Sequence, residues 1–299
     1  MFNTYLEAAS AQKLTGAIPG DPLSMDILVA RAKQDLYFKS LNQDLPEISA
    51  TTDYSVAGPH GNIPVRMNYP SQNTKLPCII FIRGAGFWAG ALDSHARTMR
   101  SLALLSSCVV CAVDYRRAPE FTYPVQRDEV LSVISWLKQE QESLGISANQ
   151  LVIFGESAGA TIALSVALTL RDREDSCLAG LTLFYCNAAG PKPTSRAYSQ
   201  WVWEQYLGHK GSSNDANAVP LLDSMKGMPP AWIGVGEDDP LITDSKELYE
   251  KMTAHNHQIT FKLFPNLPHA FVMFTGSLLP AYNALKEAAL ACSNFFKKH

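Results

Sequence analysis

Short apolar runs alternate with amphipathic segments along most of this chain, and this alternation restricts the folds that the chain can adopt. Some of the runs, such as residues 151–154, are apolar throughout, which is typical of strands buried on both faces of a sheet. Between them, apolar residues recur at spacings of three and four, the period of an α-helix. The pattern predicts an α/β fold, with an eight-stranded, mostly parallel sheet and helices on both of its faces.

The individual elements follow from the same pattern. We expect strands at residues 52–57, 65–69, 78–83, 108–115, 151–154, 181–186, 231–236 and 259–264. We expect helices at residues 25–41, 94–106, 126–144, 158–171, 243–254 and 278–298. The turn Gly-Pro-His-Gly at residues 58–61 joins the first two strands, which should therefore form an antiparallel hairpin.

Two segments fall outside the alternation and indicate a small helical cap. Residues 1–48 contain two helical stretches, and residues 187–228 are rich in proline and glycine around a short aromatic helix at 201–207. We expect residues 49–299 to form the main domain, with residues 187–228 as an insertion. The insertion and the N-terminal helices would together cover the sheet as a lid.

The composition excludes several classes of protein. Of the 299 residues, 46% are hydrophobic and 18% are charged, so intrinsic disorder is not expected. Lys plus Arg is 25 against 28 for Asp plus Glu, a balance that does not favour nucleic acid as a partner. No apolar run approaches the ~18–20 residues of a membrane span, and the N-terminus does not resemble a signal peptide. We expect a soluble, cytoplasmic protein.

The cysteines predict neither a disulfide scaffold nor a metal site. Six cysteines are too few for such a scaffold, and their apolar settings indicate buried free thiols in a reducing compartment. Cys108 and Cys111 have the C-x-x-C spacing of zinc and redox sites. Their run predicts a strand, however, on which positions three apart face opposite sides.

The strongest chemical signal is Gly155-Glu156-Ser157-Ala158-Gly159. This pentapeptide follows an expected strand and opens an expected helix, which is the context of a nucleophile elbow. The glycines allow the sharp reversal from strand to helix, because side chains at their positions would clash. Ser157 would then lie above the carboxyl ends of the strands, where open parallel sheets bind their ligands.

A serine nucleophile needs a general base, and one histidine has the right position for it. The histidines downstream of Ser157 are His209, His255, His257, His269 and His299. Among them, only His269 follows the carboxyl end of an expected strand. His269 is therefore the expected base.

The acid that orients this base should follow the preceding strand, at 231–236. That strand ends in Glu237-Asp238-Asp239, and each of these carboxylates also suits a helix N-cap or a solvated turn. The residues alone leave the choice among the three open.

Three segments together resemble the hormone-sensitive-lipase-like α/β-hydrolases, the bacterial family IV esterases. They are the elbow, Asp239-Pro240-Leu241, and Asp-Tyr-Arg-Arg-Ala-Pro-Glu at residues 114–120. The resemblance extends from about Val65 to the end of the chain. It implies an α/β-hydrolase fold, Asp239 as the triad acid, short-chain acyl esters as substrates, no metal or organic cofactor, and often a homodimer.

The oxyanion segment departs from this family, whose H-G-G-G is replaced here by Arg83-Gly84-Ala85-Gly86. By resemblance, the backbone N–H groups of Gly84, Ala85 and Ala158 would bind the oxyanion. The Ala85 methyl would narrow the space beside the acyl carbonyl and would cost about 1 kcal/mol if φ is positive there. Arg83 is expected to be structural, paired with a nearby carboxylate. The aromatic residues that we expect at the substrate pocket are Phe87, Trp88, Trp203 and Tyr206.

These residues predict a serine carboxylesterase that acts on a small-molecule ester through Ser157, His269 and Asp239. One alternative is an amidase or formamidase with the same triad, because Gly-Phe-Trp at 86–88 loosely resembles the H-G-G-x-W of kynurenine formamidases. The other is a non-catalytic binding protein like the hydrolase-fold gibberellin receptors, in which the triad is broken. The filled triad positions argue against this second alternative.

Overall fold

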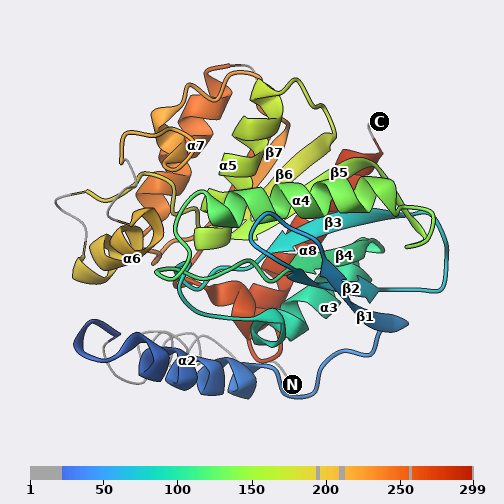
Figure 1. The fold of residues 1–299 in the computed structure, drawn as a ribbon, viewed down its shortest axis with the longest axis horizontal. Coiled ribbons are helices and arrows are strands. Elements are labelled where there is room, and N and C mark those ends of the chain that lie inside the picture. The colour runs from blue at the N-terminus through green and yellow to red at the C-terminus, as the bar shows by residue number, and fades with distance from the viewer. Residues whose placement is uncertain (1–21, 193–195, 209–212, 256–257, 298–299) are drawn as a thin grey trace.

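The computed structural model describes residues 22–192, 196–208, 213–255 and 258–297. Its centre is one eight-stranded sheet with the strand order β1-β2-β4-β3-β5-β6-β7-β8 (Figure 1). The strands are β1 (Ala50–Val56), β2 (Ile63–Tyr69), β3 (Leu76–Ile82), β4 (Val109–Val113), β5 (Ile146–Glu156), β6 (Leu178–Phe184), β7 (Ala231–Gly236) and β8 (Ile259–Phe264). The predicted eight-stranded, mostly parallel α/β fold is confirmed.

Strand direction changes at one edge of the sheet. β1 and β2 form the predicted antiparallel hairpin, and β2 is also antiparallel to β4. From β4 to β8 every neighbouring pair is parallel. The carboxyl ends of these parallel strands therefore meet along one edge, where the expected reacting residues follow β3, β5, β7 and β8.

Helices cover both faces of the sheet. The α-helices are α2 (Ile27–Leu41), α3 (Ala96–Ser106), α4 (Val125–Gln139), α5 (Ala158–Asp172), α6 (Ala197–Leu207), α7 (Ile242–Thr253) and α8 (Leu279–Phe296). Buried residues of α4, α5 and α7 belong to one core cluster, and those of α3 and α8 belong to the other. Figure 1 shows α4 lying across the face of the sheet that is turned toward the viewer.

The strand side chains divide between these two clusters as a period of two requires. Ile80 and Ile82 belong to the first cluster, whereas Ile79 and Phe81 belong to the second. The C-x-x-C pair divides in the same way, with Cys111 in the first cluster and Cys108 in the second. All six cysteines are buried free thiols, as predicted.

Several predicted boundaries differ from those of the structure, and the two largest differences have identifiable reasons. β5 begins at Ile146 because Leu76 of β3 pairs with Ile146 before the register shifts. Polar residues after Ile146 interrupt the apolar run, so the sequence pattern did not indicate this longer strand. The predicted helix at 126–144 ends at Gln139. Leu144 is buried and completes a helical spacing, but it belongs to a turn that closes at Gly145, whose φ of 65° is left-handed.

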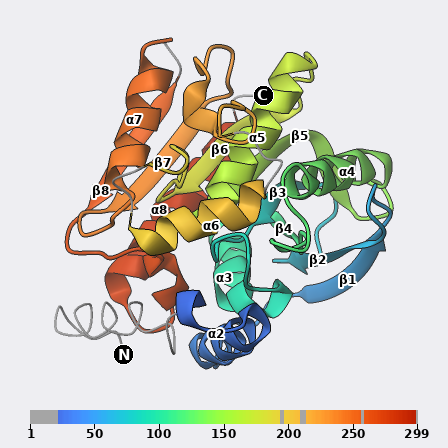
Figure 2. The same ribbon diagram turned by 60° about the vertical axis from the view of Figure 1, so that its left-hand side comes forward.

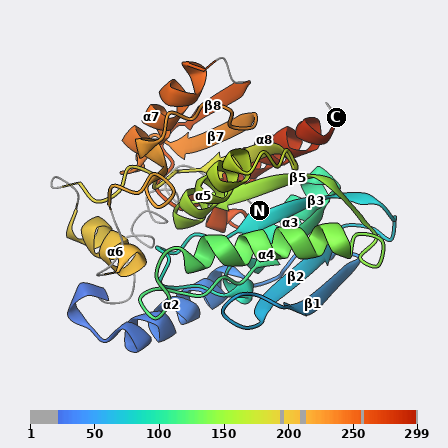
Figure 3. The same ribbon diagram turned by 45° about the horizontal axis from the view of Figure 1, so that its top comes forward.

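Helices α2 and α6 lie on the same side of the molecule, which is at the left in Figures 1 and 3 and faces the viewer in Figure 2. The predicted helix at 25–41 is confirmed, and the Asp26 carboxylate caps it by accepting the N–H of Leu28 at 2.8 Å. The first of the two N-terminal stretches lies within residues 1–21, outside the described residues. In the described part of the chain, no helix is long and apolar enough to cross a membrane.

Candidate active site

Ser157 stands at the sharp turn between β5 and α5, with φ of 52° and ψ of −120°. A Cβ at Gly155 would lie 2.7 Å from the carbonyl oxygen of Gly159, and a Cβ at Gly159 would lie 2.1 Å from that of Ile82. Neither position can hold a side chain unless the backbone moves. The elbow conformation thus follows from the two glycines of the pentapeptide, and it projects Ser157 above the carboxyl edge of the sheet.

The structure brings the three predicted triad residues together. Ser157 Oγ lies 3.0 Å from His269 Nε2, and His269 Nδ1 lies 2.9 Å from Asp239 Oδ2. These distances are those of hydrogen bonds between a nucleophile, its base and an orienting acid. The three side chains come from the loops after β5, β7 and β8, which meet only because the strands are parallel.

The position of Asp239 distinguishes it from the two carboxylates that precede it. Its side chain is fully buried beside His269, and its second oxygen, Oδ1, accepts the backbone N–H of Leu241 at 2.7 Å. Glu237 and Asp238 are exposed. Of the three consecutive carboxylates, Asp239 is the one whose carboxylate bonds to the imidazole of His269.

Electrostatics favour the protonated form of His269. Burial disfavours the imidazolium, but the facing carboxylate of Asp239, together with that of Glu156, outweighs burial and raises the pKa of His269 above its ordinary value. A base of raised pKa accepts the serine proton more readily. The geometry and the charges therefore both suit His269 to general-base work.

A buried polar network lies behind the nucleophile, and the sequence analysis did not find it. The Glu156 carboxylate is 1% exposed, accepts the Tyr185 hydroxyl at 2.6 Å and lies 2.9 Å from His95 Nε2. Burial opposes its ionisation, yet His95, Tyr185 and the backbone N–H of Gly84 together lower the pKa of Glu156. The presence of Glu156 inside the elbow was the available signal, because a charged residue there must find buried partners.

Two of the three expected oxyanion donors, Gly84 and Ala85, line the cavity above Ser157. The N–H of Gly84 also helps to lower the pKa of Glu156. Ala85 and Gly86 follow with positive φ of 69° and 61°, and both line the cavity above Ser157. Ala158 opens α5, where an α-helix leaves its first N–H groups without intrahelical partners. The N–H of Gly86 thus adds a candidate donor beside the expected donors Gly84, Ala85 and Ala158.

The oxyanion segment and Phe87, which follows it, contain residues in a strained backbone conformation, and side chains of neighbouring loops hold them in place. Ala85 and Phe87 both have left-handed φ, which costs a non-glycine residue about 1–2 kcal/mol. Arg83 is buried, bonds to Asp114 and to the carbonyl of Tyr115 at 3.1 Å each, and stacks 4.0 Å above the Tyr115 ring. Arg83 therefore has the structural role that we expected.

A cavity of about 1070 Å³ opens above Ser157 and His269. The loops after the parallel strands and residues of α2 and α6 line it, among them Gln34, Phe38, Trp88, Tyr198, Val202 and Phe274. Of the four aromatic residues expected at the substrate pocket, Trp88 lines this cavity. Phe87, Trp203 and Tyr206 are not among its lining residues. They are buried against one another, with the rings of Phe87 and Tyr206 stacked at 3.9 Å.

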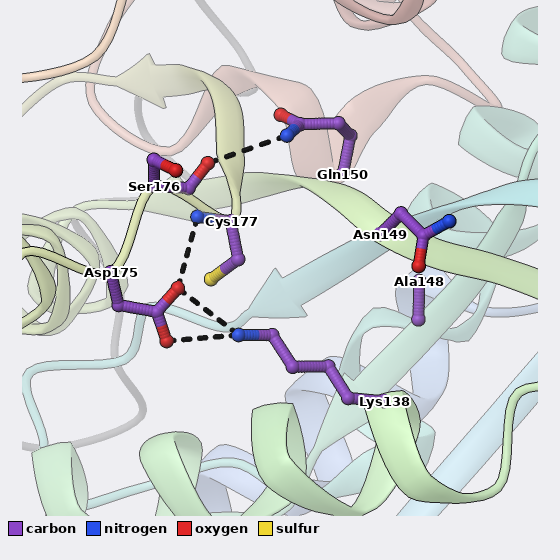
Figure 4. A pocket seen from close by; sticks show the side chains of 7 residues that line it. All are labelled: Lys138, Ala148, Asn149, Gln150, Asp175, Ser176 and Cys177. Atoms are coloured by element: carbon purple, nitrogen blue, oxygen red, sulfur yellow. Dashed lines mark hydrogen bonds and ion pairs between the residues drawn. The ribbon is translucent and has the colours of Figure 1, made fainter.

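A second, shallow hollow of about 270 Å³ lies near the amino ends of β5 and β6 (Figure 4). The Lys138 ammonium pairs with both oxygens of Asp175, at 3.1 and 2.9 Å, and Asp175 also accepts the N–H of Cys177. These polar groups bond to one another at the edge opposite Ser157, so we assign the hollow no part in the chemistry. No cluster of three or more potential metal ligands occurs among the described residues.

Comparison with known proteins agrees with the fold. Residues 79–273 match a family described as having the alpha/beta hydrolase fold. The chain therefore belongs to the α/β-hydrolases, in the hormone-sensitive-lipase-like family that the sequence resembled.

Solved structures resemble it over nearly its whole length. A hyperthermophilic esterase from the archaeon Pyrobaculum calidifontis is 24% identical, with a TM-score of 0.91 over 98% of this chain and 99% of that one. An α/β-hydrolase enzyme from the metagenome of Lake Arreo is 26% identical, with a TM-score of 0.90 over 98% of each chain. A thermostable carboxylesterase from a metagenomic library is 25% identical, with a TM-score of 0.87 over 91% and 98%.

Proposed function

We propose that this protein is a carboxylic ester hydrolase that uses Ser157 as a nucleophile and forms an acyl-enzyme. One observation carries the proposal: the continuous hydrogen-bonded series from Ser157 through His269 to the buried Asp239, at the floor of a cavity. Solved relatives named as esterases or carboxylesterases support the same chemistry.

The reaction has two halves. Ser157 Oγ attacks the ester carbonyl carbon while its proton passes to His269 Nε2. The tetrahedral adduct then collapses: the bond to the alcohol oxygen breaks, that oxygen takes the proton from the imidazolium, and the acyl group stays on Ser157. Water, deprotonated by His269, attacks the acyl-enzyme, and the second collapse releases the carboxylic acid and restores Ser157. Asp239 keeps the imidazole in the tautomer that presents Nε2 to the serine.

In this proposal, the oxyanion of each tetrahedral adduct is bound by the expected backbone N–H groups of Gly84, Ala85 and Ala158, together with that of Gly86. Removing one such donor costs about 3–4 kcal/mol in the enzymes where this has been measured. The two positive-φ residues in series form the concave backbone turn that can direct successive N–H groups at one anion.

The substrates proposed are short-chain acyl esters of small alcohols. Residues 49–299 form the catalytic domain, and α2 and α6 form the cap over the cavity. Trp88, Phe274 and Val202 supply apolar walls, while Gln34 and Tyr198 bring polar groups to the same space. A cavity closed by a cap on one side limits the length of the acyl chain that fits beside Ser157.

The decisive test combines a fluorophosphonate probe with hydrolysis of p-nitrophenyl esters from acetate to palmitate. Wild-type protein should be labelled at Ser157 and should prefer the shorter esters. Ser157→Ala should lose labelling and all but about a thousandth of kcat. Ser165→Ala is the matched control, because Ser165 is buried in α5 and its hydroxyl has no hydrogen-bond partner among the residues that the structure describes. Full activity in the Ser157 variant, or faster hydrolysis of amides than of matched esters, would contradict the proposal.

A further inference from the structure

Arg31, a buried arginine on helix α2, contacts the backbone of Trp88, two residues after the oxyanion segment. Arg31 is 6% exposed, and its Nε donates to the carbonyl of Trp88 at 2.7 Å. Its Nη2 donates to the carbonyl of Ala118 at 2.7 Å, and its two terminal nitrogens bind the carboxylate of Glu120 at 2.6 Å each. Arg31 is absent from the described residues that line the cavity, so it does not touch a substrate there.

Arg31 completes a set of contacts that fix the carbonyl groups of the oxyanion segment. The Tyr115 hydroxyl lies 3.0 Å from both the carbonyl of Arg83 and that of Gly84. The N–H of Ala118 donates to the carbonyl of Phe87 at 3.0 Å, and Arg31 holds the next carbonyl, that of Trp88. The carbonyl of one residue and the N–H of the next lie in one peptide plane, so the contact to Trp88 fixes the N–H of Ala89. That N–H donates to the carbonyl of Ala85 at 3.1 Å, and the peptide plane of this carbonyl carries the N–H of Gly86.

The conformation of this segment makes these contacts necessary. Ala85 and Phe87 have left-handed φ, which an isolated L-residue avoids. The segment therefore keeps its shape only while the surrounding structure holds it. Arg31 is the contact that comes from the N-terminal part of the chain, whereas Tyr115 and Ala118 belong to the main domain.

We propose that Arg31 is a positioning residue that couples the docking of helix α2 to the alignment of the Ala85 and Gly86 N–H groups. This inference rests on the serine-esterase function proposed above. The guanidinium acts on the transition state through the Trp88 carbonyl and leaves ground-state binding of the ester unchanged. The cap helix thus contributes to catalysis as well as covering the cavity.

The test compares Arg31→Ala and Arg31→Lys with two controls. Arg97→Ala is a matched control because Arg97 bonds to the carbonyls of Gln43 and Asp44 just after α2, away from the oxyanion segment. Glu120→Gln removes the ion pair but leaves Arg31 able to bind both carbonyls. The measurements are kcat and KM for p-nitrophenyl butyrate, and affinity for a trifluoromethyl ketone, whose adduct with serine carries the oxyanion.

Arg31→Ala should lower kcat about ten- to a hundred-fold with KM within about two-fold, and the ketone affinity should fall in parallel. The kcat of Arg31→Lys should lie between those of the wild type and Arg31→Ala, whereas both controls should keep kcat within about three-fold of the wild-type value. Equal losses in Arg31→Ala and Arg97→Ala, or unchanged kcat in Arg31→Ala, would overturn the inference. If circular dichroism shows that Arg31→Ala does not fold, the test rests on Arg31→Lys. A loss of kcat of at least five-fold in Arg31→Lys supports the inference, and a smaller loss overturns it. Failure of the proposed function would show separately, as activity in Ser157→Ala.

Discussion

The Tyr185 hydroxyl donates a hydrogen bond of 2.6 Å to the carboxylate of Glu156, the residue immediately before the proposed nucleophile. The Tyr185 ring also packs edge-on against His269, with ring centroids 4.8 Å apart. The elbow and the base are therefore supported by the same side chain. The backbone N–H of Gly84, in the oxyanion segment, also helps to lower the pKa of Glu156.

The acid limb of the pH profile should lie above pH 6.5. Asp239 and Glu156 raise the pKa of His269 above its ordinary value of 6.5, in spite of burial. Below that pKa the imidazole carries a proton and cannot accept another, so activity should be lost as pH falls through it. The measurement is kcat/KM from pH 5 to 9, with circular dichroism to confirm folding at each pH. A midpoint below 6.5 would contradict the assigned electrostatics.

Glu156→Gln should move this limb toward lower pH. The substitution keeps the shape of the side chain but removes a negative charge that helps to raise the pKa of His269. It also weakens buried hydrogen bonds, at about 1–3 kcal/mol of folding stability. Tyr185→Phe is the control, since it keeps the Glu156 charge and should not shift the limb downward. An unchanged midpoint in Glu156→Gln would mean that its charge does not act on the base.

Asp239→Asn should reduce kcat about 10⁴-fold, because an amide at this position holds the imidazole in the wrong tautomer. Asp238→Asn, one residue away and exposed, should change kcat by less than about three-fold. Steady-state kinetics of the two purified variants check the pair. A similar loss in both, or a larger loss at Asp238, would reassign the triad acid.

The sequence predicted those features that depend on local pattern. β7 and β8 have the bounds that their sequence patterns indicated, and the elbow has the shape that its two glycines require. The sequence could not reveal that Glu156 is paired with His95 and Tyr185, because those contacts depend on how distant loops pack.

The orientation of the aromatic side chains could not be predicted from the sequence either. Trp88 lines the cavity while its neighbour Phe87 turns away to stack on Tyr206. The left-handed φ of Phe87 directs its ring into the core, and nothing in the residue type signals that conformation. Which side a loop side chain faces is decided by backbone dihedrals that the sequence leaves unspecified.

Ala85→Gly should stabilise the fold and alter acyl selectivity. The φ of Ala85 is 69°, a conformation that glycine adopts without strain, so the free energy of unfolding should rise by about 0.5–1 kcal/mol. For a chain of this size the expected rise in Tm is about 2 °C. If the methyl crowds the acyl carbonyl, the ratio of kcat/KM for a pivalate ester to that for an acetate ester should increase a few-fold.

Ser107→Gly separates the two effects. Ser107 has a φ of 57° at the exposed end of α3, remote from the cavity residues, so its replacement should raise Tm without changing the pivalate-to-acetate ratio. Calorimetry and kinetics on both variants provide the comparison. A gain in Tm at both positions with an unchanged ratio in Ala85→Gly would show that the Ala85 methyl points away from the acyl group. A fall in kcat/KM for both esters at Ala85→Gly would instead indicate that the methyl helps to hold the segment, because a looser backbone aligns the N–H groups less well for any ester.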